Sequence, residues 1–370
     1  MLIPINKPII NKEEEKAVLD VLKSGELTDS SYKGGRYTRE FESKMRSILR
    51  CKHVIAVNSG TAALHCALLA VGVKQGDEVI VPSFTFVATA NAVLACGAKP
   101  VFVDIGEDYN IDVNQIKKAI TRKTKAIIPV HLYGYPADMD QVREIASKND
   151  LFVIEDAAES LGAEYRGKQT GTLSDAGCFS FYASKVVTSG EGGAVATNND
   201  EIADKVRMIR NHGMVEGYDS RTFGLNYRLP EVSAAIGSVQ LDKLQSHIDK
   251  RRKNAVYLNE RICDKGNVKF TQNSKDRTHV FYLYTVSVGE DRDKLLHGLR
   301  EKGIGASVYF KIPVHKTPLY YSLGYGSKKL PKTESAAREV ISLPVHPGLS
   351  EKELDYIASE FIKQLRKSSK

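Results

Sequence analysis

The sequence predicts an α/β protein in which a large domain, built on a mainly parallel sheet, precedes a smaller C-terminal α/β domain. Between residues 54 and 156, short apolar runs alternate with helix-like segments, the pattern of strands buried between two layers of helices. The chain has 370 residues, 42 % hydrophobic and 26 % charged, so it is a globular protein too long for one small core. We place the large domain in residues 1–240 and the small one in residues 241–370.

The expected elements follow in chain order. Asn11 and Glu14 form a capping box at the start of a first helix, and a second helix covers residues 41–49. Strands are expected at residues 54–57, 79–81, 101–103, 126–130 and 152–154, with helices at 60–71, 84–97, 112–121 and 138–149. Shorter strands follow residue 163, and later elements are a helix at 230–262, strands at 279–288 and 307–310, a helix at 291–302 and two closing helices. Because ligands bind beyond the carboxyl ends of parallel strands, the residues that follow these strands are the functional candidates.

The net charge of +8 is unevenly distributed, since residues 241–370 contain 25 basic and 15 acidic residues. Such a basic segment is compatible with nucleic acid, acidic lipid or an anionic small molecule, and equally with a solvated surface and a Lys/Arg tail. No helix-turn-helix, RRM or zinc-finger pattern accompanies the charge. We therefore expect no nucleic-acid partner.

The sequence also favours a cytoplasmic protein without membrane association. Its five cysteines include no C-x-x-C pair, which is typical of reduced thiols. The first ten residues lack the basic start and apolar run of a signal peptide. Residues 79–98 carry no charge and are long enough to span a bilayer. They contain Pro82, Ser83 and Thr85, however, which favours a buried strand, a turn and a core helix.

A first candidate site is the segment Asn58-Ser59-Gly60-Thr61, at a junction between a strand and a helix. Free backbone N–H groups and the positive end of the helix dipole at such a junction suit a phosphate group. A plain helix N-cap is the alternative interpretation. The segment is not a Walker loop, because no G-x-x-x-x-G-K-[ST] pattern is present.

Two further candidates carry charge. Asp156 follows Glu155 at the end of an apolar strand, where a carboxylate is costly to bury unless a cation accompanies it. A helix cap or a metal ligand is the alternative, but no residues with metal-ligand spacing surround it, so we expect no metal. Lys185 follows an apolar, aromatic segment. Desolvation there would lower its pKa and free an amine for Schiff-base chemistry, although an exposed loop lysine has the same local sequence.

The combination is more specific than its parts. A phosphate-binding helix start, a buried aspartate and a lysine are what pyridoxal phosphate requires: the lysine holds the aldehyde, the aspartate keeps the ring nitrogen protonated, and the ring acts as an electron sink. The glycine cluster Gly190, Gly192 and Gly193 would allow a flat ligand to approach the backbone closely.

The chain resembles the DegT/DnrJ/EryC1/StrS family of pyridoxal-phosphate-dependent sugar aminotransferases. The resemblance implies the type I fold of these transferases, which is that of aspartate aminotransferase. The matching stretches follow one another along nearly the whole chain: NSGTAAL (58–64), PSFTFVATANAV (82–93), PVHLYG (129–134), IEDAAESLGA (154–163), FSFYASK (179–185), GEGGA (190–194), GLNYRLPEVSAAIGSVQL (224–241) and SLPVHPGLS (342–350).

The resemblance implies a role for each matching position. Lys185 would form the Schiff base with the cofactor, and Asp156 would pair with its pyridine nitrogen. The remaining cofactor contacts would be Gly60, Thr61 and Ser180 on the phosphate, Phe86 on the ring face, Glu159 near the ring hydroxyl, and Asn226 reaching the phosphate from the other subunit of a homodimer with shared sites.

Three positions depart from the residues common in the family. Ala183-Ser184 stands where Pro-Thr is frequent, Glu159 where Gln or His is frequent, and Phe86 where Trp is frequent. None of these changes removes a catalytic group. Position 185 is Lys, whereas the family's dehydratases have His there.

The implied reaction is a ping-pong transamination from an amino acid, L-glutamate, to a keto sugar, specifically a nucleotide-linked 4-keto-6-deoxyhexose. Lys185 would move the proton as general base and acid. Arg228 and cations of the basic C-terminal third would meet the substrate phosphates, and His315 would face the sugar. The alternatives are a free keto-cyclitol or other keto sugar as acceptor, another pyridoxal-phosphate reaction, or a non-catalytic regulator with the same fold. The presence of both Lys185 and Asp156 argues against a regulator.

Overall fold

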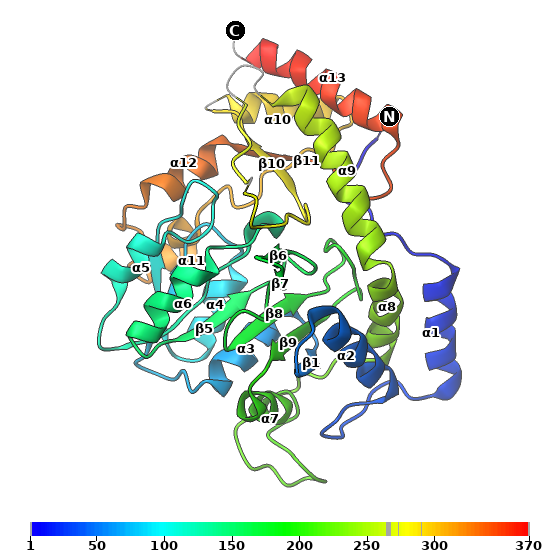
Figure 1. Cartoon of the computed structure of the whole chain (residues 1–370), viewed down its shortest axis with the longest axis vertical. Helices are drawn as coiled ribbons and strands as arrows, with labels where there is room; N and C mark the ends of the chain where they lie inside the picture. The colour runs from blue at the N-terminus through cyan, green and yellow to red at the C-terminus, as the bar shows by residue number, and fades with distance from the viewer. Residues whose placement is uncertain (1, 264–267, 273, 290, 369–370) are drawn as a thin grey trace.

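A seven-stranded sheet forms the centre of the molecule (Figure 1). The computed structural model describes residues 2–263, 268–272, 274–289 and 291–368. The strand order is β1-β9-β8-β5-β4-β2-β3, and β9 pairs antiparallel with β1 and β8 while the other neighbouring strands pair parallel. The predicted large, mostly parallel sheet is confirmed. Its strands are β1 (His53–Val57), β2 (Glu78–Pro82), β3 (Lys99–Val103), β4 (Thr124–Ile127), β5 (Phe152–Asp156), β8 (Ala176–Ser180) and β9 (Gly193–Thr197).

Helices cover both faces of the sheet. In β1, Val54 and Ala56 belong to the core that contains α2 and α8, whereas Ile55 and Val57 belong to the core that contains α3 and α4. Successive side chains of a strand point to opposite faces, so a strand that is apolar at every position needs cover on both. The helices of this part are α1 (Lys12–Ser24), α2 (Arg36–Leu49), α3 (Gly60–Ala70), α4 (Ala88–Ala95), α5 (Val113–Ala119), α6 (Met139–Lys148), α7 (Asp200–Ile209) and α8 (Glu231–Asp242).

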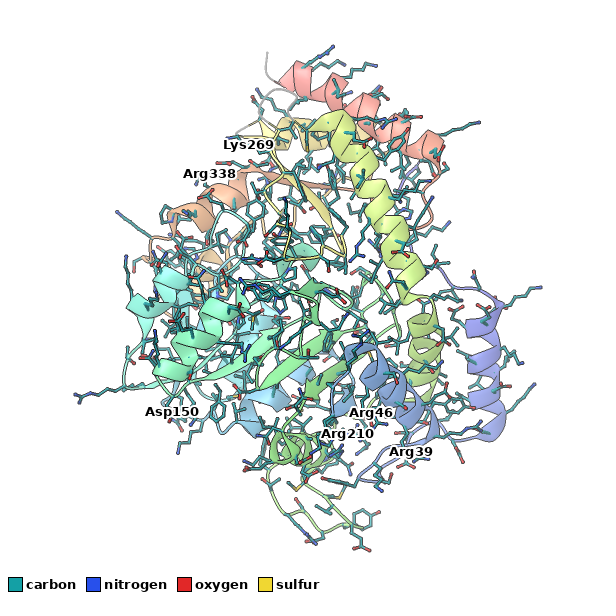
Figure 2. All side chains as sticks on the ribbon, viewed as in Figure 1. Arg39, Arg46, Asp150, Arg210, Lys269 and Arg338 are labelled. Atoms are coloured by element: carbon teal, nitrogen blue, oxygen red, sulfur yellow. The ribbon has the colours of Figure 1, made fainter. Side chains whose placement is uncertain are left out.

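Buried ionic contacts hold the N-terminal helices on this sheet. The predicted capping box of α1 is confirmed: the Asn11 backbone N–H donates to Glu14 Oε2 at 2.8 Å. Glu14 also accepts from Lys243 Nζ at 2.7 Å, which ties α1 to the end of α8. Arg210, labelled in Figure 2, donates to Glu42 Oε1 of α2 at 2.7 Å and to the carbonyl of Ala56 in β1 at 2.8 Å.

The C-terminal elements build a separate core cluster, at the top of Figure 1. Ile3 belongs to this cluster, and its backbone pairs with the segment around Ile304. The chain therefore begins beside its C-terminal elements, and the break between α8 and α9 falls at Lys243. The domain boundary at residue 240 stays a prediction. The elements that contribute to this cluster are α9 (Leu244–Ile262), β10 (Tyr284–Ser287), α10 (Arg292–Glu301), β11 (Val340–Leu343) and α13 (Glu351–Ser368). The helices α11 (Pro318–Ser322) and α12 (Pro331–Glu339) belong instead to the cores on the two faces of the large sheet.

The structure corrects four of the expected elements. The helix expected at 84–97 begins only at Ala88, and the helix expected at 230–262 divides into α8 and α9. The strand expected at 279–288 shortens to β10, and the one expected at 307–310 is absent except for a single bridge at Ser307. Phe281 and Phe310 have φ angles of 50° and 60°, and this left-handed backbone cannot continue a strand.

The charge-free residues 79–98 form most of β2, a loop and α4, followed by a turn. Among the residues that the structure describes, no helix combines the length and the apolar character needed to cross a membrane. The remaining elements that the structure describes are a hairpin of β6 (Glu164–Tyr165) and β7 (Lys168–Gln169) and the short helices η1 (Leu132–Gly134) and η2 (Val314–Lys316).

Candidate active site

The parallel strands bring their carboxyl ends to one edge of the sheet, where a cavity of about 390 Å³ opens. β5 ends there at Asp156 and β8 at Ser180, while the reversed strand β9 begins at the same edge with Gly193. This is the edge at which ligands of α/β sheets bind. The cavity is lined by polar side chains and aromatic rings, among them Ser59, Thr61, Thr85, Phe86, Asp156, Glu159, Ser180, Tyr182, Lys185, Glu191, Tyr282, Tyr309 and Phe310.

The start of α3 forms one end of the cavity. Ser59 caps the helix, because its hydroxyl accepts from the backbone N–H of Ala62 at 3.1 Å. Within the described residues, the backbone N–H groups of Gly60 and Thr61 donate to no other group of the chain. They lie at the positive end of the helix dipole beside Ser180, and a Cβ on Gly60 would come within 2.9 Å of the Ser180 Cβ. The arrangement fits a phosphate group.

Gly193 lets β9 pass close to this helix start. A Cβ at this position would collide with the Ser59 carbonyl oxygen and lie 2.8 Å from the Gly60 nitrogen, and both are backbone atoms that cannot rotate away. Close backbone approach is the reason for glycine here.

We expect Gly193→Ala to destabilise the cofactor-free protein by about 1–3 kcal/mol, because the methyl group overpacks a backbone contact. It should also weaken pyridoxal-phosphate binding, since the displaced backbone belongs to the phosphate site. Urea unfolding and fluorescence titration with the cofactor measure the two effects. Gly106→Ala is the control, because Gly106 does not have a left-handed φ and an added Cβ would first meet Asp108 Oδ1, the end of a side chain, at 3.2 Å. Equal stability of the Gly193 variant and the wild type would contradict the prediction.

Asp156 lies at the floor of the cavity and is 5 % exposed. Its Oδ2 accepts from the Thr89 hydroxyl at 2.8 Å, and its Oδ1 accepts from the Ala158 backbone N–H at 3.2 Å. Burial raises the pKa of Asp156 above its usual value of 3.8, against the opposing effect of these hydrogen bonds. A buried carboxylate of this kind is stabilised by a positively charged ligand group.

Lys185 lies in the loop between β8 and β9, with a side chain that is 15 % exposed. Its Nζ is 3.7 Å from Glu159 Oε1 and 4.3 Å from the centre of the Tyr282 ring. The expected fall in its pKa is wrong for the cofactor-free protein. Burial does lower the pKa, but Tyr282, Glu159 and Asp156 together outweigh burial and raise it above the usual 10.5. The two carboxylates keep the amine protonated when no other cation is present.

Glu159 is held by an unusual backbone conformation. Its Oε2 accepts from the Tyr133 backbone N–H at 2.7 Å, and Tyr133 has a φ angle of 62°. A non-glycine residue in this region is strained, and such strain concentrates at functional sites. Burial raises the pKa of Glu159 above 4.5, although Lys185 opposes this. Phe86, 62 % exposed, forms part of the cavity wall.

The structure thus gathers seven of the predicted site residues around one cavity: Gly60, Thr61, Phe86, Asp156, Glu159, Ser180 and Lys185. Three do not line it. The Asn226 carbonyl accepts from Asn58 Nδ2 at 3.4 Å, and Arg228 Nη1 donates to the side chain of Asn211 at 2.7 Å. His315 is wholly buried and shares a hydrogen bond with the Ser83 hydroxyl at 2.6 Å. This placement does not support the role of facing the sugar, and the roles of all three stay predictions.

Sequence reasoning missed Tyr282, Tyr309 and Phe310, which form an aromatic part of the cavity lining. All three fall in or beside segments that we interpreted as strands, at 279–288 and 307–310. Clusters of aromatic residues are typical of strands. The aromatic pattern was therefore interpreted as a sign of strands and not as part of a binding site.

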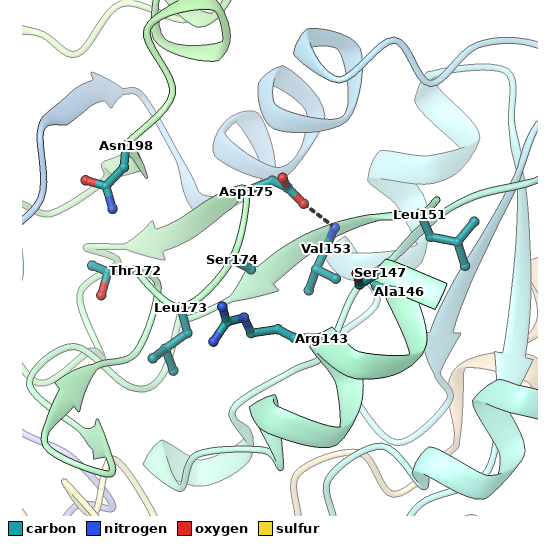
Figure 3. A pocket seen from close by; sticks show the side chains of 10 residues that line it. All are labelled: Arg143, Ala146, Ser147, Leu151, Val153, Thr172, Leu173, Ser174, Asp175 and Asn198. Atoms are coloured by element: carbon teal, nitrogen blue, oxygen red, sulfur yellow. Dashed lines mark hydrogen bonds between the residues drawn. The ribbon is translucent and has the colours of Figure 1, made fainter. Parts of the chain in front are cut away.

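A second, more open hollow of about 470 Å³ lies at the opposite edge of the sheet (Figure 3). Val153 and Asp175 lie there at the start of β5 and just before β8, and the Asp175 carboxylate accepts from the Val153 backbone N–H at 2.8 Å. Arg143 is the one basic residue that lines it in the part of the chain that the structure describes. None of the predicted site residues lines this hollow, so the other edge of the sheet is the candidate active site.

Comparison with known proteins shows the family. A model of the DegT/DnrJ/EryC1/StrS aminotransferase family matches residues 8–362. The chain belongs to this family. As a member of the DegT/DnrJ/EryC1/StrS family, it is a pyridoxal-phosphate-dependent aminotransferase with the type I transferase fold that the sequence predicts.

Relatives within the family cover almost the full chain. A pleiotropic regulatory protein of Geobacillus stearothermophilus is 42 % identical over 94 % of each chain. A GDP-perosamine synthase of Caulobacter vibrioides is 39 % identical over 96 % of each chain. The structure of S. venezuelae DesV in complex with a ketimine intermediate matches with a TM-score of 0.92 and 37 % identity, covering 96 % of this chain and 94 % of DesV.

The cavity fits the family's cofactor. The N–H groups of Gly60 and Thr61 suit its phosphate, and Asp156 is a buried acid without an ion-pair partner in the described part of the chain. Among the described residues, Lys185 supplies the only lysine amine in the lining. Pyridoxal phosphate complements all three features, because it supplies a phosphate for the N–H groups, a ring nitrogen for Asp156 and an aldehyde for the lysine.

Proposed function

We propose that this protein transfers the amino group of L-glutamate to a nucleotide-linked 4-keto-6-deoxyhexose in a ping-pong cycle. Support for a sugar substrate comes from relatives such as GDP-perosamine synthase and a dTDP-3-amino-3,4,6-trideoxy-α-D-glucose transaminase, which are 39 % identical to this chain. The two names specify different nucleotides and sugars. The nucleotide linkage is therefore the shared feature that we assign to this chain.

The observation that carries the proposal is a single cavity lined by the Lys185 amine, by the buried carboxyl groups of Asp156 and Glu159, and by the start of α3 with its free N–H groups. When bound, pyridoxal phosphate supplies an electron sink for the carbon that loses its proton. In our proposal Gly60, Thr61 and Ser180 hold the phosphate, and Asp156 keeps the ring nitrogen protonated.

Lys185 moves the proton as general base and then as general acid. To act as a base, its amine must first be neutral. In the cofactor-free protein Asp156 and Glu159 favour the protonated amine. A cation paired with Asp156 removes part of that stabilisation, so cofactor binding and activation of Lys185 are coupled through one carboxylate.

We also propose that the protein is a cytoplasmic homodimer with shared active sites. Phe86 and Tyr182 line the cavity, yet they are 62 % and 50 % exposed, and aromatic side chains at a cavity mouth suit cover by a second chain. Asn226 lies outside the cavity of its own chain, as a residue that serves the other subunit would. Arg228 and basic residues of the C-terminal third remain our candidates for the substrate phosphates.

The decisive experiment separates the two half-reactions. The protein loaded with pyridoxal phosphate is mixed with L-glutamate, and absorption spectra follow conversion of the cofactor from its aldehyde to its amine form. Keto sugar nucleotides carrying different bases are then added, and mass spectrometry detects the amino sugar.

We expect glutamate to convert the cofactor and a nucleotide-linked 4-keto-6-deoxyhexose to restore it. Restoration only by a free keto-cyclitol would replace the proposed acceptor. Failure of every amino acid to convert the cofactor would favour the alternative of a non-catalytic regulator. The relative from Geobacillus stearothermophilus is named a pleiotropic regulatory protein.

A further inference from the structure

Arg251 of α9 is a buried cation outside the cavity lining. It is 2 % exposed, and within the described residues no carboxylate lies within ion-pair distance of it. Burial lowers its pKa to about 10. Its partners are neutral groups instead: Nη1 donates to the carbonyls of Phe281 at 3.2 Å and Tyr282 at 3.1 Å, and Nη2 donates to Asn6 Oδ1 at 2.9 Å. Leaving a guanidinium without a counter-ion is costly, so its position calls for an explanation.

Asn6 connects Arg251 to the loop that contains Lys185. Its Nδ2 donates to the carbonyl of Ser184 at 2.9 Å, and Ser184 immediately precedes Lys185. The Ser184 hydroxyl shares a hydrogen bond with the Tyr282 hydroxyl at 3.1 Å. Arg251 therefore contacts the Tyr282 backbone directly, and it is connected to the Lys185 loop through Asn6.

Tyr282 needs such support because its loop is not part of a strand. Phe281, the residue before it, has a φ of 50°, and the loop joins β10 only at Tyr284. The Tyr282 ring nevertheless lies 4.3 Å from the Lys185 amine, close enough for a cation–π contact. The Leu283 backbone N–H donates to the Tyr133 carbonyl at 3.2 Å, so the loop is held from both ends.

We propose that Arg251 and Asn6 are positioning residues that hold the Tyr282 ring against the Lys185 amine, so that the ring steers this amine during proton transfer. The proposal rests on the proposed function in one respect, the role of Lys185 as the base. The contact itself belongs to the cofactor-free protein.

The charged and titratable groups that face Lys185 come from three segments. Asp156 is at the end of β5, Glu159 is in the loop after it, and Tyr282 comes from the C-terminal part of the chain. The carboxylates attract the ammonium group from any direction. A ring attracts it only over its face, so the ring also fixes the direction of the amine. A displaced Tyr282 would leave Lys185 to the carboxylates alone and make its protonated form less stable.

The test measures the titration of Lys185 in the cofactor-free protein. The rate at which trinitrobenzenesulfonate modifies Lys185 is followed by peptide mass spectrometry between pH 7 and 11. We expect Tyr282→Leu to raise the rate at pH 9 by about three- to tenfold, since loss of a partly desolvated cation–π contact lowers the pKa of the amine. Tyr282→Phe keeps the ring but removes the hydroxyl, which also raises the pKa of Lys185, so its rate should lie between those of the wild type and Tyr282→Leu.

Arg251→Met and Asn6→Ala should change the rate in the same direction as Tyr282→Leu. Asn6→Ala removes only a half-buried amide, so it gives the answer even if Arg251→Met does not fold. Arg252→Met is the matched control: Arg252 also lies on α9 and donates to a backbone carbonyl of this segment, that of His279 at 2.9 Å, without contacting the Lys185 loop. Its Lys185 titration should match the wild type.

Three results would overturn the proposal: lower melting temperature but unchanged Lys185 titration in Asn6→Ala, an equal titration shift in Arg252→Met, or Tyr282→Phe behaving as Tyr282→Leu. With the cofactor bound, kcat of Asn6→Ala should fall while the KM for glutamate stays within about twofold, because a displaced base affects proton transfer and not binding. If glutamate conversion fails in the wild type while Lys185 titrates as expected, the proposed function falls and the contact network stands.

Discussion

Lys185→Ala is expected to abolish transamination while the protein still folds. The substitution removes the base that moves the proton, and such proton transfer contributes about 10²–10⁴-fold to a rate. The loss of the covalent attachment to the cofactor adds to this effect. We therefore expect turnover of glutamate to fall by at least about 10³-fold, measured as the absorbance change of the cofactor on mixing with glutamate.

The same variant changes the electrostatics of the cavity. Lys185 lowers the pKa of both Asp156 and Glu159 in the wild type, so without it both carboxyl groups retain protons to higher pH. Lys205→Ala is a suitable control, because this exposed lysine on α7 pairs only with Glu201 of the same helix among the described residues. Measurable glutamate conversion by Lys185→Ala would assign the base to another residue.

The second large effect concerns the neighbouring carboxylates Glu155 and Asp156, whose removal should change the stability of the protein in opposite ways. Glu155 is fully buried and accepts four hydrogen bonds: from His131 Nε2 at 2.9 Å, the backbone N–H groups of Gly171 and Leu173 at 2.7 Å each, and the Ser174 hydroxyl at 2.9 Å. Removing it leaves the His131 side chain and the two backbone N–H groups buried without this partner. We expect Glu155→Ala to lower the free energy of unfolding by about 3–5 kcal/mol, measured by urea unfolding.

Asp156 should behave in the opposite way in the cofactor-free protein. Its pKa in the folded state lies above the usual 3.8 because of burial, so the folded protein binds this proton more tightly than the unfolded chain does. Its unfavourable contribution is absent below pH 3.8 and grows as the pH rises through the folded-state pKa. Asp156→Asn should therefore be at least as stable as the wild type at pH 8. Its stability relative to the wild type should be greater at pH 8 than at pH 4, close to the usual pKa of the carboxyl group.

Activity of the Asp156 variant should nonetheless be lost, because an amide cannot keep the ring nitrogen of the cofactor protonated. Urea unfolding at the two pH values and the glutamate half-reaction are the measurements. The Thr89→Val variant removes the hydroxyl that donates to Asp156 Oδ2 and should give an intermediate loss of activity. Strong destabilisation by Asp156→Asn at pH 8, equal to that of Glu155→Ala, would show that both carboxylates are structural.

Much of the fold could be predicted because its signals are local. The apolar runs at 54–57, 79–81, 101–103 and 152–154 became β1, β2, β3 and β5, since a strand covered on both faces needs apolar residues throughout. The capping box of Asn11 and Glu14 joins groups three residues apart. The loops at 279–283 and 308–310 were missed because Phe281 and Phe310 take left-handed backbone angles that only distant contacts enforce.

The sequence by itself determined the class of protein and the chemical groups available to it. Alternating strands and helices, a hydroxyl-rich helix start, a strand-end aspartate and a lysine after an aromatic strand were sufficient to indicate pyridoxal phosphate. Tertiary structure alone decided which of the neighbours Glu155 and Asp156 faces the cavity, why the pKa of Lys185 rises before the cofactor binds, and how Arg251 and Asn6 reach that lysine. These properties depend on burial and on contacts between segments that are in some cases more than 100 residues apart. The electrostatic effect of a group is set by what surrounds it in space and not by its neighbours in the chain.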